Sequence, residues 1–321
     1  MNNPWQNIDQ PGLDFNVRLV SEEHPLLLYW GRDTQGRYLF ICDLKGQVPP
    51  EKQSLPKLSG ISFGLARDHS GVKLVLILNE TTNWEIFFSL CSDIIRTTSV
   101  LDNPESASGV FLRRLIRWSE FLRRKRPEIL SPEAIKGLIG ELLFLEEKLA
   151  PAFSWDDAVA SWKGPEDAPQ DFSIHEIAME VKCQTGGTTP SVKITSADQL
   201  TPQLPDAYLI VYTITTADRD DNEGFSLNDL VERIRRRLET ASENTRERFE
   251  ELLFLADYIM REEYDDTKFR RVAAKCYMID DDFPRILLSA IPAGIERVSY
   301  SLKLEQCKPF ESSPSWWGKL S

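Results

Sequence analysis

Histidine and cysteine are scarce in this chain, and neither forms a recognisable ligand motif. The 321 residues include three histidines and five scattered cysteines, with no CxxC pair. Zinc sites and disulfide frameworks both need such residues at characteristic spacings, so neither is expected here. The cysteines instead fit a reducing compartment. A histidine-based nucleophilic triad is poorly supported, because His175 is better explained as a turn residue.

Long apolar runs are missing as well. Leu74–Leu78 is one of the longest, whereas a membrane-spanning helix needs about 20 apolar residues. The first residues, Met1–Trp5, lack the basic start and the apolar core of a signal peptide. With 41% hydrophobic and 27% charged residues, the composition is that of an ordinary globular protein. We expect a cytoplasmic protein without a membrane segment.

Basic residues are fewer than acidic ones. The chain has 38 Lys and Arg and 50 Asp and Glu, which gives a formal net charge of −12. An acidic surface repels a polyanion over about a Debye length, on the order of 10 Å. The basic residues are nevertheless clustered, at 113–126 and again at 233–237. The first cluster is either a solvated helix face or a face that contacts phosphates. The residues predicted to contact nucleic acid are Arg113, Arg117, Arg124 and Lys125.

The N-terminal region, residues 1–105, is predicted to be a β-rich module. Short apolar runs are separated by turn signals such as Asp33–Gly36 and Asp68–Gly71. No group of catalytic residues is recognisable in this region. The pattern of short strands and turns predicts an antiparallel module. The expected strands are Phe15–Val20, Leu26–Trp30, Tyr38–Leu44, Ile61–Ala66, Lys73–Leu78 and Trp84–Phe88.

Two helices are predicted to open the central region, residues 106–220. In Ser106–Arg124, apolar residues recur at helical spacing. The second helix, Pro132–Ala150, has Ser131 as its N-cap. Glu141 falls within the apolar stripe of this helix, where an unpaired carboxylate is costly. Glu141 therefore needs a cation or hydrogen-bond donors.

Four strands and one short helix are predicted after Trp155. Together with the preceding helix they give the order helix, strand, strand, strand, helix, strand, and the short helix carries Gln199. Residues 221–321 are predicted to form a C-terminal extension that is first helical and then β-rich. Ser226 is the predicted N-cap of its first helix. The four strands are Ala158–Trp162, Gln170–Ile174, Ile177–Cys183 and Ala207–Ile214.

The second and third of these strands are predicted to form a hairpin with His175–Glu176 as its turn. Opposed residues then have numbers that add up to 351, so Asp171 faces Glu180 with Cβ atoms roughly 4.5–5.5 Å apart. Lys182 shares the face of Glu180, because alternate residues of a strand point the same way. The residues between them point to the other, packed face. The hairpin therefore brings two carboxylates and a lysine together.

Two opposed carboxylates repel each other unless a cation compensates them. A divalent cation would do so, since Mg²⁺ takes one or two protein carboxylates together with waters and phosphate oxygens. It can also acidify a bound water for an in-line displacement at phosphorus. Lys182 would add positive charge beside the nucleophile or the phosphate. The alternative is an ordinary ion pair between Glu180 and Lys182, because this pattern also arises by chance in a charged chain.

Four short stretches resemble a known superfamily: Gly137–Leu142, Gln170–Phe172, Met179–Cys183 and Ile194–Leu200. Residues 131–215 resemble the core of PD-(D/E)XK nucleases. More closely, the chain resembles a bacterial family whose proteins are described as candidate members of the PD-(D/E)XK superfamily. The genes of this family tend to lie in phage-defence or restriction-type clusters. Gln170 stands where the motif's name has a proline, which is often absent in the superfamily. The resemblance implies a mixed α+β or α/β fold, with a restriction-endonuclease-like core whose central mixed sheet is flanked by helices.

By this resemblance, Asp171 and Glu180 are metal ligands and Lys182 is the catalytic lysine. Glu141 would be a further carboxylate at the metal, and Gln199 an accessory polar residue. The implied function is Mg²⁺-dependent hydrolysis of phosphodiester bonds in DNA, with Mn²⁺ as a substitute and other defence-system subunits as partners. The alternative is an accessory subunit of the same fold with weak or no activity, which binds a partner protein or nucleic acid. Whether the chain forms a homo-oligomer stays open.

Overall fold

The structure, a computed structural model, is divided into two compact units, Met1–Glu128 and Ile129–Ser321. The predicted boundaries after residues 105 and 220 stay predictions. The helix that begins at Pro104 belongs with the N-terminal strands, and the C-terminal residues belong with the central region. The residues that the structure describes are 3–43, 58, 60–68, 71–81, 84–99, 104–124, 129–186, 190–201, 204–218, 220–295 and 298–317.

The N-terminal unit contains a five-stranded antiparallel sheet in the order β1-β2-β3-β5-β4. Five of the six predicted strands are thereby confirmed among the described residues. The central strand β3 is buried on both faces from Leu39 to Asp43. The strands are β1 (Phe15–Leu19), β2 (Leu27–Asp33), β3 (Tyr38–Asp43), β4 (Ile61–Asp68) and β5 (Gly71–Leu78).

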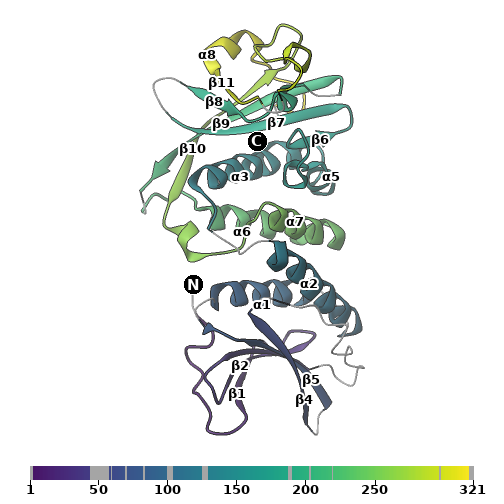
Figure 1. Ribbon diagram of the computed structural model, residues 1–321, viewed down its shortest axis with the longest axis vertical. Coiled ribbons are helices and arrows are strands. Elements are labelled where there is room, and N and C mark those ends of the chain that lie inside the picture. The colour runs from purple at the N-terminus through teal and green to yellow at the C-terminus, as the bar shows by residue number, and fades with distance from the viewer. Residues whose placement is uncertain are drawn as a thin grey trace. The chain divides into compact units, whose positions relative to one another are not determined.

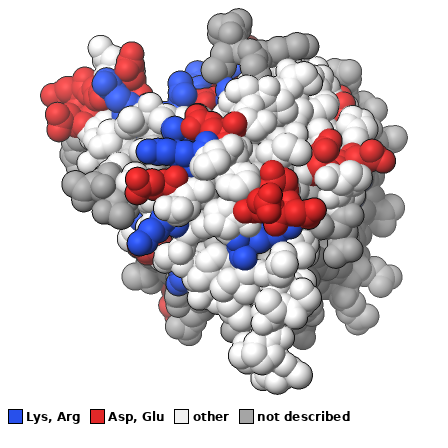
Figure 2. Space-filling model, turned by 90° about the horizontal axis from the view of Figure 1, so that it is seen from above, with Lys and Arg blue, Asp and Glu red and all other residues white. Residues whose placement is uncertain are grey.

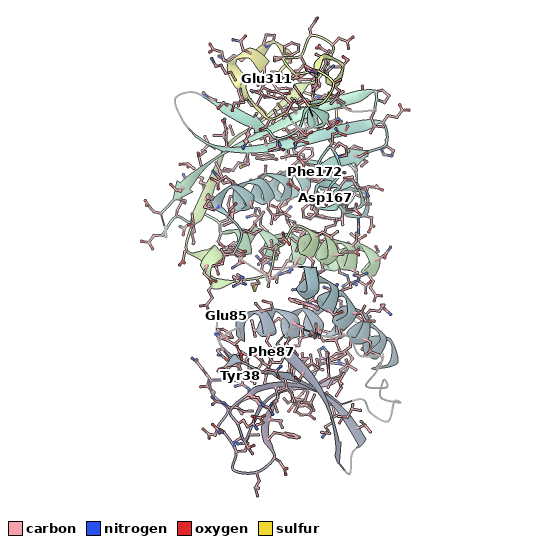
Figure 3. All side chains as sticks on the ribbon, in the orientation of Figure 1. Tyr38, Glu85, Phe87, Asp167, Phe172 and Glu311 are labelled. Atoms are coloured by element: carbon pink, nitrogen blue, oxygen red, sulfur yellow. The ribbon has the colours of Figure 1, made fainter. Side chains whose placement is uncertain are left out.

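The sixth predicted strand, Trp84–Phe88, is wrong, because these residues open helix α1 (Trp84–Ser99). A five-residue apolar run fits either a strand or a helix, and the helical period becomes visible only over the longer segment. Phe87 of α1 points toward the sheet (Figure 3). Trp5 stacks on both Phe87 and Tyr38, with ring centroids 5.3 and 5.0 Å away. These aromatic contacts fix α1 on the sheet.

Helix α2 (Pro104–Arg124) packs against α1 through a buried ion pair. Arg114 is fully buried, and its guanidinium donates to both carboxylate oxygens of Asp93 at 2.6 and 2.7 Å. The indole N–H of Trp118 donates to the same carboxylate at 2.9 Å. Breaking such a pair leaves an uncompensated buried charge, so Asp93 and Arg114 are expected to hold the two helices together.

The second unit contains a mixed four-stranded sheet in the order β10-β9-β7-β6. β7 runs parallel to β9, whereas β6 and β10 are antiparallel to their neighbours. The central strand β9 is buried on both faces from Ala207 to Tyr212, in line with its continuous apolar run. The strands are β6 (Phe172–Ile174), β7 (Ile177–Thr185), β9 (Asp206–Ala217) and β10 (Lys268–Met278).

Helices cover one face of this sheet in two layers (Figure 1). α3 and α5 lie against the sheet, and α6 and α7 pack behind them. Serine side chains cap the starts of all four, as at Ser131, which accepts from the backbone N–H of Ala134 at 3.2 Å. The helices are α3 (Pro132–Phe144), α5 (Trp155–Ser161), α6 (Leu227–Arg237) and α7 (Glu243–Leu255).

The opposite face of the sheet is covered mainly by a β-ribbon. β8 (Ser191–Ile194) pairs antiparallel with β11 (Tyr300–Lys303), and the short α8 (Leu304–Cys307) follows. Val192 and Leu302 of this ribbon pack with residues of β9 and β10 in a second core. The C-terminal segment therefore completes the unit that carries the predicted site.

The predicted order of elements is present, but one predicted strand is wrong. Ala158–Trp162 lies in and just after α5, which begins at the N-cap Ser154. β8 takes the third place among the strands instead, ahead of the 3-10 helix at Ala197–Leu200. The predicted helix from Pro132 continues beyond α3 as a π-helical turn (Leu145–Leu149) and then α4 (Ala150–Ala152). The fold is mixed α+β, as predicted.

Candidate metal centre

The β6–β7 hairpin has the predicted register. Ile174 pairs with Ile177 and Phe172 with Met179, so the residue numbers of each pair add up to 351. His175 in the turn adopts the left-handed conformation, with φ of 51°. This confirms the prediction that His175 shapes a turn. Because the register holds, Asp171, immediately before β6, lies opposite Glu180.

Asp171 is fixed by backbone hydrogen bonds where β6 begins. Its Oδ2 accepts from the N–H of Val181 at 2.8 Å, in place of the strand carbonyl that would otherwise continue the pairing with β7. Its own carbonyl accepts from the N–H groups of Lys163 and Gly164 at 2.7 and 2.9 Å. The backbone of Asp171 is therefore held by residues 163 and 164, and its carboxylate by the N–H of Val181.

Glu180 is a buried carboxylate, and among the described residues its cationic contact is Lys182. The side chain is 1% exposed, and its Oε1 lies 2.6 Å from the Lys182 Nζ. Within the described part of the chain, neither oxygen accepts a hydrogen bond of good geometry. Buried polar groups are nearly always hydrogen-bonded, and an unsatisfied one costs several kcal/mol in an apolar environment. Glu180 is thus short of partners at the place where a metal is predicted.

Glu141 has the donor that its place in an apolar helix stripe requires. Its Oε2 accepts from the indole N–H of Trp162 at 2.6 Å. Trp162 is fully buried and stacks on Phe172 of β6, with ring centroids 6.4 Å apart. The indole of Trp162 therefore contacts both Phe172, the first residue of β6, and the carboxylate of Glu141 on α3. The sequence reasoning finds Glu141 but not this partner.

Gly164 allows Glu141 and Asp171 to lie close together. A Cβ at this position would be 2.9 Å from both the Asp171 Oδ1 and the Glu141 Oε2. Heavy atoms are essentially never this close to a real Cβ, so only glycine leaves room for both carboxylates. The sequence signal that could have found it is the Gly164–Pro165 turn between Trp162 and Asp171.

Burial and mutual repulsion shift the ionisation of these carboxylates. Burial and the neighbouring Asp171 raise the pKa of Glu141 to about 8, although Trp162 and Lys182 act in the opposite direction. Burial also raises the pKa of Asp171, and burial together with Asp171 raises that of Glu180. For Lys182, burial lowers the pKa, but the nearby carboxylates outweigh it and the net shift is upward. The ammonium therefore stays charged.

Two features of the site suit a divalent cation: its negative charge, and the shortage of hydrogen-bond donors to Glu180 among the described residues. The carboxylates of Glu141, Asp171 and Glu180 share the ammonium group of Lys182, and apart from this short contact Glu180 has no hydrogen-bond donor among the described residues. Carboxylate oxygens are the ligands that Mg²⁺ prefers. In the described residues, no three Asp, Glu, His or Cys side chains already form a metal-binding arrangement. Lys182 supplies the cation beside Glu180 in this state, so metal binding would require the ion pair to rearrange.

Gln199 is placed near the hairpin, but its side chain turns to the backbone. Its Oε1 accepts from the N–H and the hydroxyl of Thr195 at 2.9 and 3.1 Å, as part of a capping box with Ser196. The side chain of Gln170 donates to the carbonyl of Asp198 at 2.8 Å and ties this turn to the residue before Asp171. The accessory role of Gln199 stays a prediction.

The predicted nucleic-acid contacts lie in the other unit. Arg113 is exposed and Arg117 half-buried on α2, Arg124 ends that helix, and Lys125 lies outside the described residues. On the face shown in Figure 2, basic side chains form small groups interleaved with acidic ones. The role of these residues in binding nucleic acid stays a prediction.

Comparison with known families decides the family. A family model described as "Putative PD-(D/E)XK family member (DUF4420)" matches residues 1–305. The chain belongs to this family. The match runs through both compact units, so the PD-(D/E)XK family pattern includes the N-terminal sheet. No curated protein and no solved structure matches the chain.

Membership of a PD-(D/E)XK family indicates a nuclease-like function, and nucleases of this kind usually use divalent metal ions. The family resemblance seen in the sequence is thereby confirmed. In the part of the chain that the structure describes, no helix has the length and apolar character needed to cross a membrane.

Proposed function

We propose that the protein hydrolyses phosphodiester bonds in DNA with Mg²⁺, or Mn²⁺ in its place, held by Asp171 and Glu180 and assisted by Glu141. The observation that carries this proposal is the buried carboxylate of Glu180, which accepts no good hydrogen bond from the described residues and faces the Asp171 carboxylate. Family membership supports the nuclease class. The element order from α3 to β9 supports a restriction-endonuclease-like core.

Each side chain has a distinct task in this proposal. A bound Mg²⁺ would supply a Lewis acid that acidifies water and neutralises phosphate charge. Lys182, partly exposed and still protonated, would place its ammonium beside the scissile phosphate once the ion pair with Glu180 opens. The N–H of Val181 orients Asp171, and the indole of Trp162 orients Glu141. Gly164 keeps the space between these two carboxylates open.

The cellular setting follows from the same resemblance. We infer a cytoplasmic protein of a bacterial defence or restriction-type system, with other subunits of that system and DNA as its partners. The support is the family's nuclease-like character together with the sequence's resemblance to proteins from such gene clusters. The five cysteines are free thiols, which is consistent with a reducing compartment.

The test is DNA cleavage by the purified full chain. Supercoiled plasmid is incubated with Mg²⁺, Mn²⁺ or EDTA, and nicked and linear forms are quantified on gels. Cleavage should require the metal, and Lys182→Ala and Asp171→Asn should each reduce it by at least about 100-fold. Thermal unfolding of each variant shows whether the fold is kept. Undiminished cleavage by both folded variants would overturn the assignment.

Lys275→Ala is the matched control. Lys275 lies on β10, is 45% exposed and pairs only at the surface with Glu311, at 2.9 Å. Its loss removes one positive charge without touching the carboxylates, so cleavage should stay within about twofold of the unchanged protein, because exposed ion pairs contribute little. An equal loss of cleavage in Lys275→Ala and Lys182→Ala would show that cleavage depends on the net charge of the protein and not on the proposed site.

A second function is favoured by two observations. The net charge of −12 opposes binding of a free-standing nuclease to DNA, and Lys182 is engaged by Glu180. Both fit an accessory subunit that keeps the fold without turnover. Isothermal titration with Mn²⁺ separates the two functions: a saturable site lost in Asp171→Asn supports the nuclease, and no binding by the folded protein supports the accessory subunit.

A further inference from the structure

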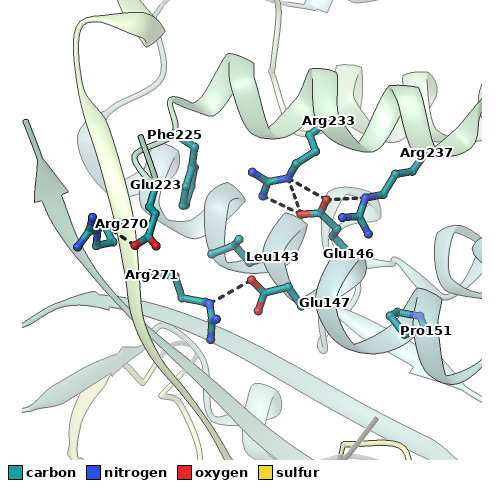
Figure 4. A pocket seen from close by; sticks show the side chains of 10 residues that line it. All are labelled: Leu143, Glu146, Glu147, Pro151, Glu223, Phe225, Arg233, Arg237, Arg270 and Arg271. Atoms are coloured by element: carbon teal, nitrogen blue, oxygen red, sulfur yellow. Dashed lines mark hydrogen bonds and ion pairs between the residues drawn. The ribbon is translucent and has the colours of Figure 1, made fainter. Parts of the chain in front are cut away.

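A second polar site lies at the C-terminal end of α3. A pocket of 640 Å³ opens between the end of α3, helix α6 and strand β10, a size that suits a small ligand. We call it the arginine pocket, and Figure 4 shows how its charged side chains face one another. It is lined chiefly by Glu146, Glu147, Arg233, Arg237, Arg270 and Arg271.

A π-helical turn places both glutamates in the arginine pocket. The turn spans Leu145–Leu149, and the N–H of Ala150 donates to the carbonyl of Leu145, five residues back. π-turns inside helices are rare and often mark functional sites. Glu146 faces the arginines of α6, whereas its neighbour Glu147 faces β10 (Figure 4). The irregular turn thus directs two successive carboxylates to the same pocket.

Two successive arginines of β10 also line the arginine pocket, next to a β-bulge. The pairing of β10 with β9 shifts register between Arg271 and Ala273, and Val272 at the bulge is 59% exposed. Arg270 and Arg271 precede the bulge and pair regularly with Thr215 and Ile214 of β9, so they point to opposite sides of the strand. Arg270 contacts Asp221 and Glu223, whereas Arg271 contacts Glu147. Bulges are over-represented near active sites, where they redirect side chains. The π-helical turn thus supplies both glutamates, and the β-bulge lies directly after Arg271.

The pocket has more N–H donors than its own carboxylates can use. Arg233 binds both oxygens of the buried Glu146 at 2.7–3.0 Å, and the Nε of Arg237 lies 3.1 Å from the same carboxylate. Arg271 contacts Glu147 through its Nε at 3.1 Å. No terminal nitrogen of Arg237 or Arg271 makes a hydrogen bond to the described residues, and these side chains are 53% and 39% exposed.

We propose that the arginine pocket binds a phosphate-bearing ligand through the terminal nitrogens of Arg237 and Arg271. Guanidinium groups match the oxygens of phosphate in charge and geometry, and arginine is the usual residue for such recognition. Arg233 neutralises Glu146, so the other two arginines can bind an external anion. The ligand is either a free nucleotide or the 5′-phosphate of a nucleic-acid strand, which share this chemistry. The site is separate from Asp171 and Glu180.

Isothermal titration of the full chain in EDTA tests this proposal. The probes are AMP, pyrophosphate, and a short oligonucleotide with and without a 5′-phosphate. At least one phosphorylated probe should bind, and Arg237→Gln and Arg271→Gln should each weaken it by about tenfold or more. Tighter binding of AMP than of pyrophosphate or either oligonucleotide identifies a free nucleotide. A preference for the 5′-phosphorylated strand over its 5′-hydroxyl form identifies a nucleic-acid end.

Two controls keep this test independent of the proposed nuclease. Lys275→Gln removes a charge from the same strand outside the pocket and should leave affinity unchanged, as should Asp171→Asn, which removes the proposed metal ligand. Arg237 and Arg271 lie on different elements, so one variant still reports if the other fails to fold. No binding of any probe, or equal binding by both folded arginine variants, would overturn the proposal whatever the outcome for DNA cleavage.

Discussion

Replacement of Glu141 by glutamine should stabilise the metal-free protein at high pH. The carboxylate is buried beside Asp171, and its pKa is raised from 4.5 to about 8. Between these two pH values the folded state binds the proton more tightly than the unfolded state, so stability falls as pH rises through this window. A neutral amide removes that loss. It also keeps an oxygen that can accept from the Trp162 indole.

The size of this effect follows from the shift. One pKa unit corresponds to about 1.4 kcal/mol, so the raised pKa of Glu141 sets an upper bound on the order of 4 kcal/mol at pH 8. We expect about 1–3 kcal/mol, because the amide nitrogen must also find an acceptor. For a unit of this size that is a rise in Tm of roughly 2–10 °C. Near pH 5 the gain should nearly vanish.

The assay is thermal unfolding in EDTA at pH 5 and pH 8, followed by circular dichroism, for the unchanged protein and Glu141→Gln. Addition of Mn²⁺ at pH 8 should then raise the Tm of the unchanged protein more than that of the variant, because only the former has the third carboxylate. A variant that is less stable than the unchanged protein at pH 8 would refute the reasoning. It would mean that Glu141 is ionised without penalty in the metal-free state.

Four further outcomes are expected. Affinity for Mn²⁺ should rise from pH 6 to pH 8 with net proton release, measured by titration in buffers of different ionisation enthalpy, whereas a flat profile contradicts the raised pKa values. Gly164→Ala should lower cleavage at least about tenfold in a folded protein, by crowding the carboxylates. Trp162→Phe should weaken Mn²⁺ binding about tenfold, measured by titration, since Glu141 loses its donor. Asp93→Asn should cost the N-terminal unit about 3 kcal/mol in urea unfolding, because it breaks the buried pair with Arg114; a cost below about 1 kcal/mol would contradict this role.

The hairpin could be predicted from sequence because its physics is local. Strand alternation has a period of two, and a two-residue turn fixes the register once its position is known. Placing the turn at His175–Glu176 therefore determines that Asp171 lies opposite Glu180. The burial of Glu180 does not follow from the register, because the register does not determine which other elements pack over the hairpin. The sequence predicts that Asp171 and Glu180 are opposed, but not that Glu180 is buried.

Short apolar runs are where prediction fails. Trp84–Phe88 and Ala158–Trp162 have the length and composition of strands, yet both belong mainly to helices. For the second run, Ser154 with Asp157 three residues later is a capping signal that could have indicated the helix. β8 pairs with β11 more than 100 residues away, as from Ile194 to Tyr300, and no local pattern encodes that pairing.

Trp162 and Gly164 show why the site is larger than its motif. Their roles arise only when α5, α3 and the start of β6 meet, so spacing along the chain does not reveal them. The arginine pocket is similar, because the sequence shows a basic run at 233–237 but not that β10 adds Arg270 and Arg271 to it. Side chains gathered from distant elements are visible only in the fold.

The most direct test of the central claim is a crystal structure of the full chain soaked in Mn²⁺, with anomalous scattering recorded at the metal's absorption edge. We predict one strong anomalous peak bound by Asp171 and Glu180, close to Glu141, with the Lys182 ammonium displaced from its 2.6 Å contact with Glu180. The absence of a peak at this place, with the Lys182–Glu180 ion pair intact at saturating Mn²⁺, would contradict the claim that these residues form a metal centre.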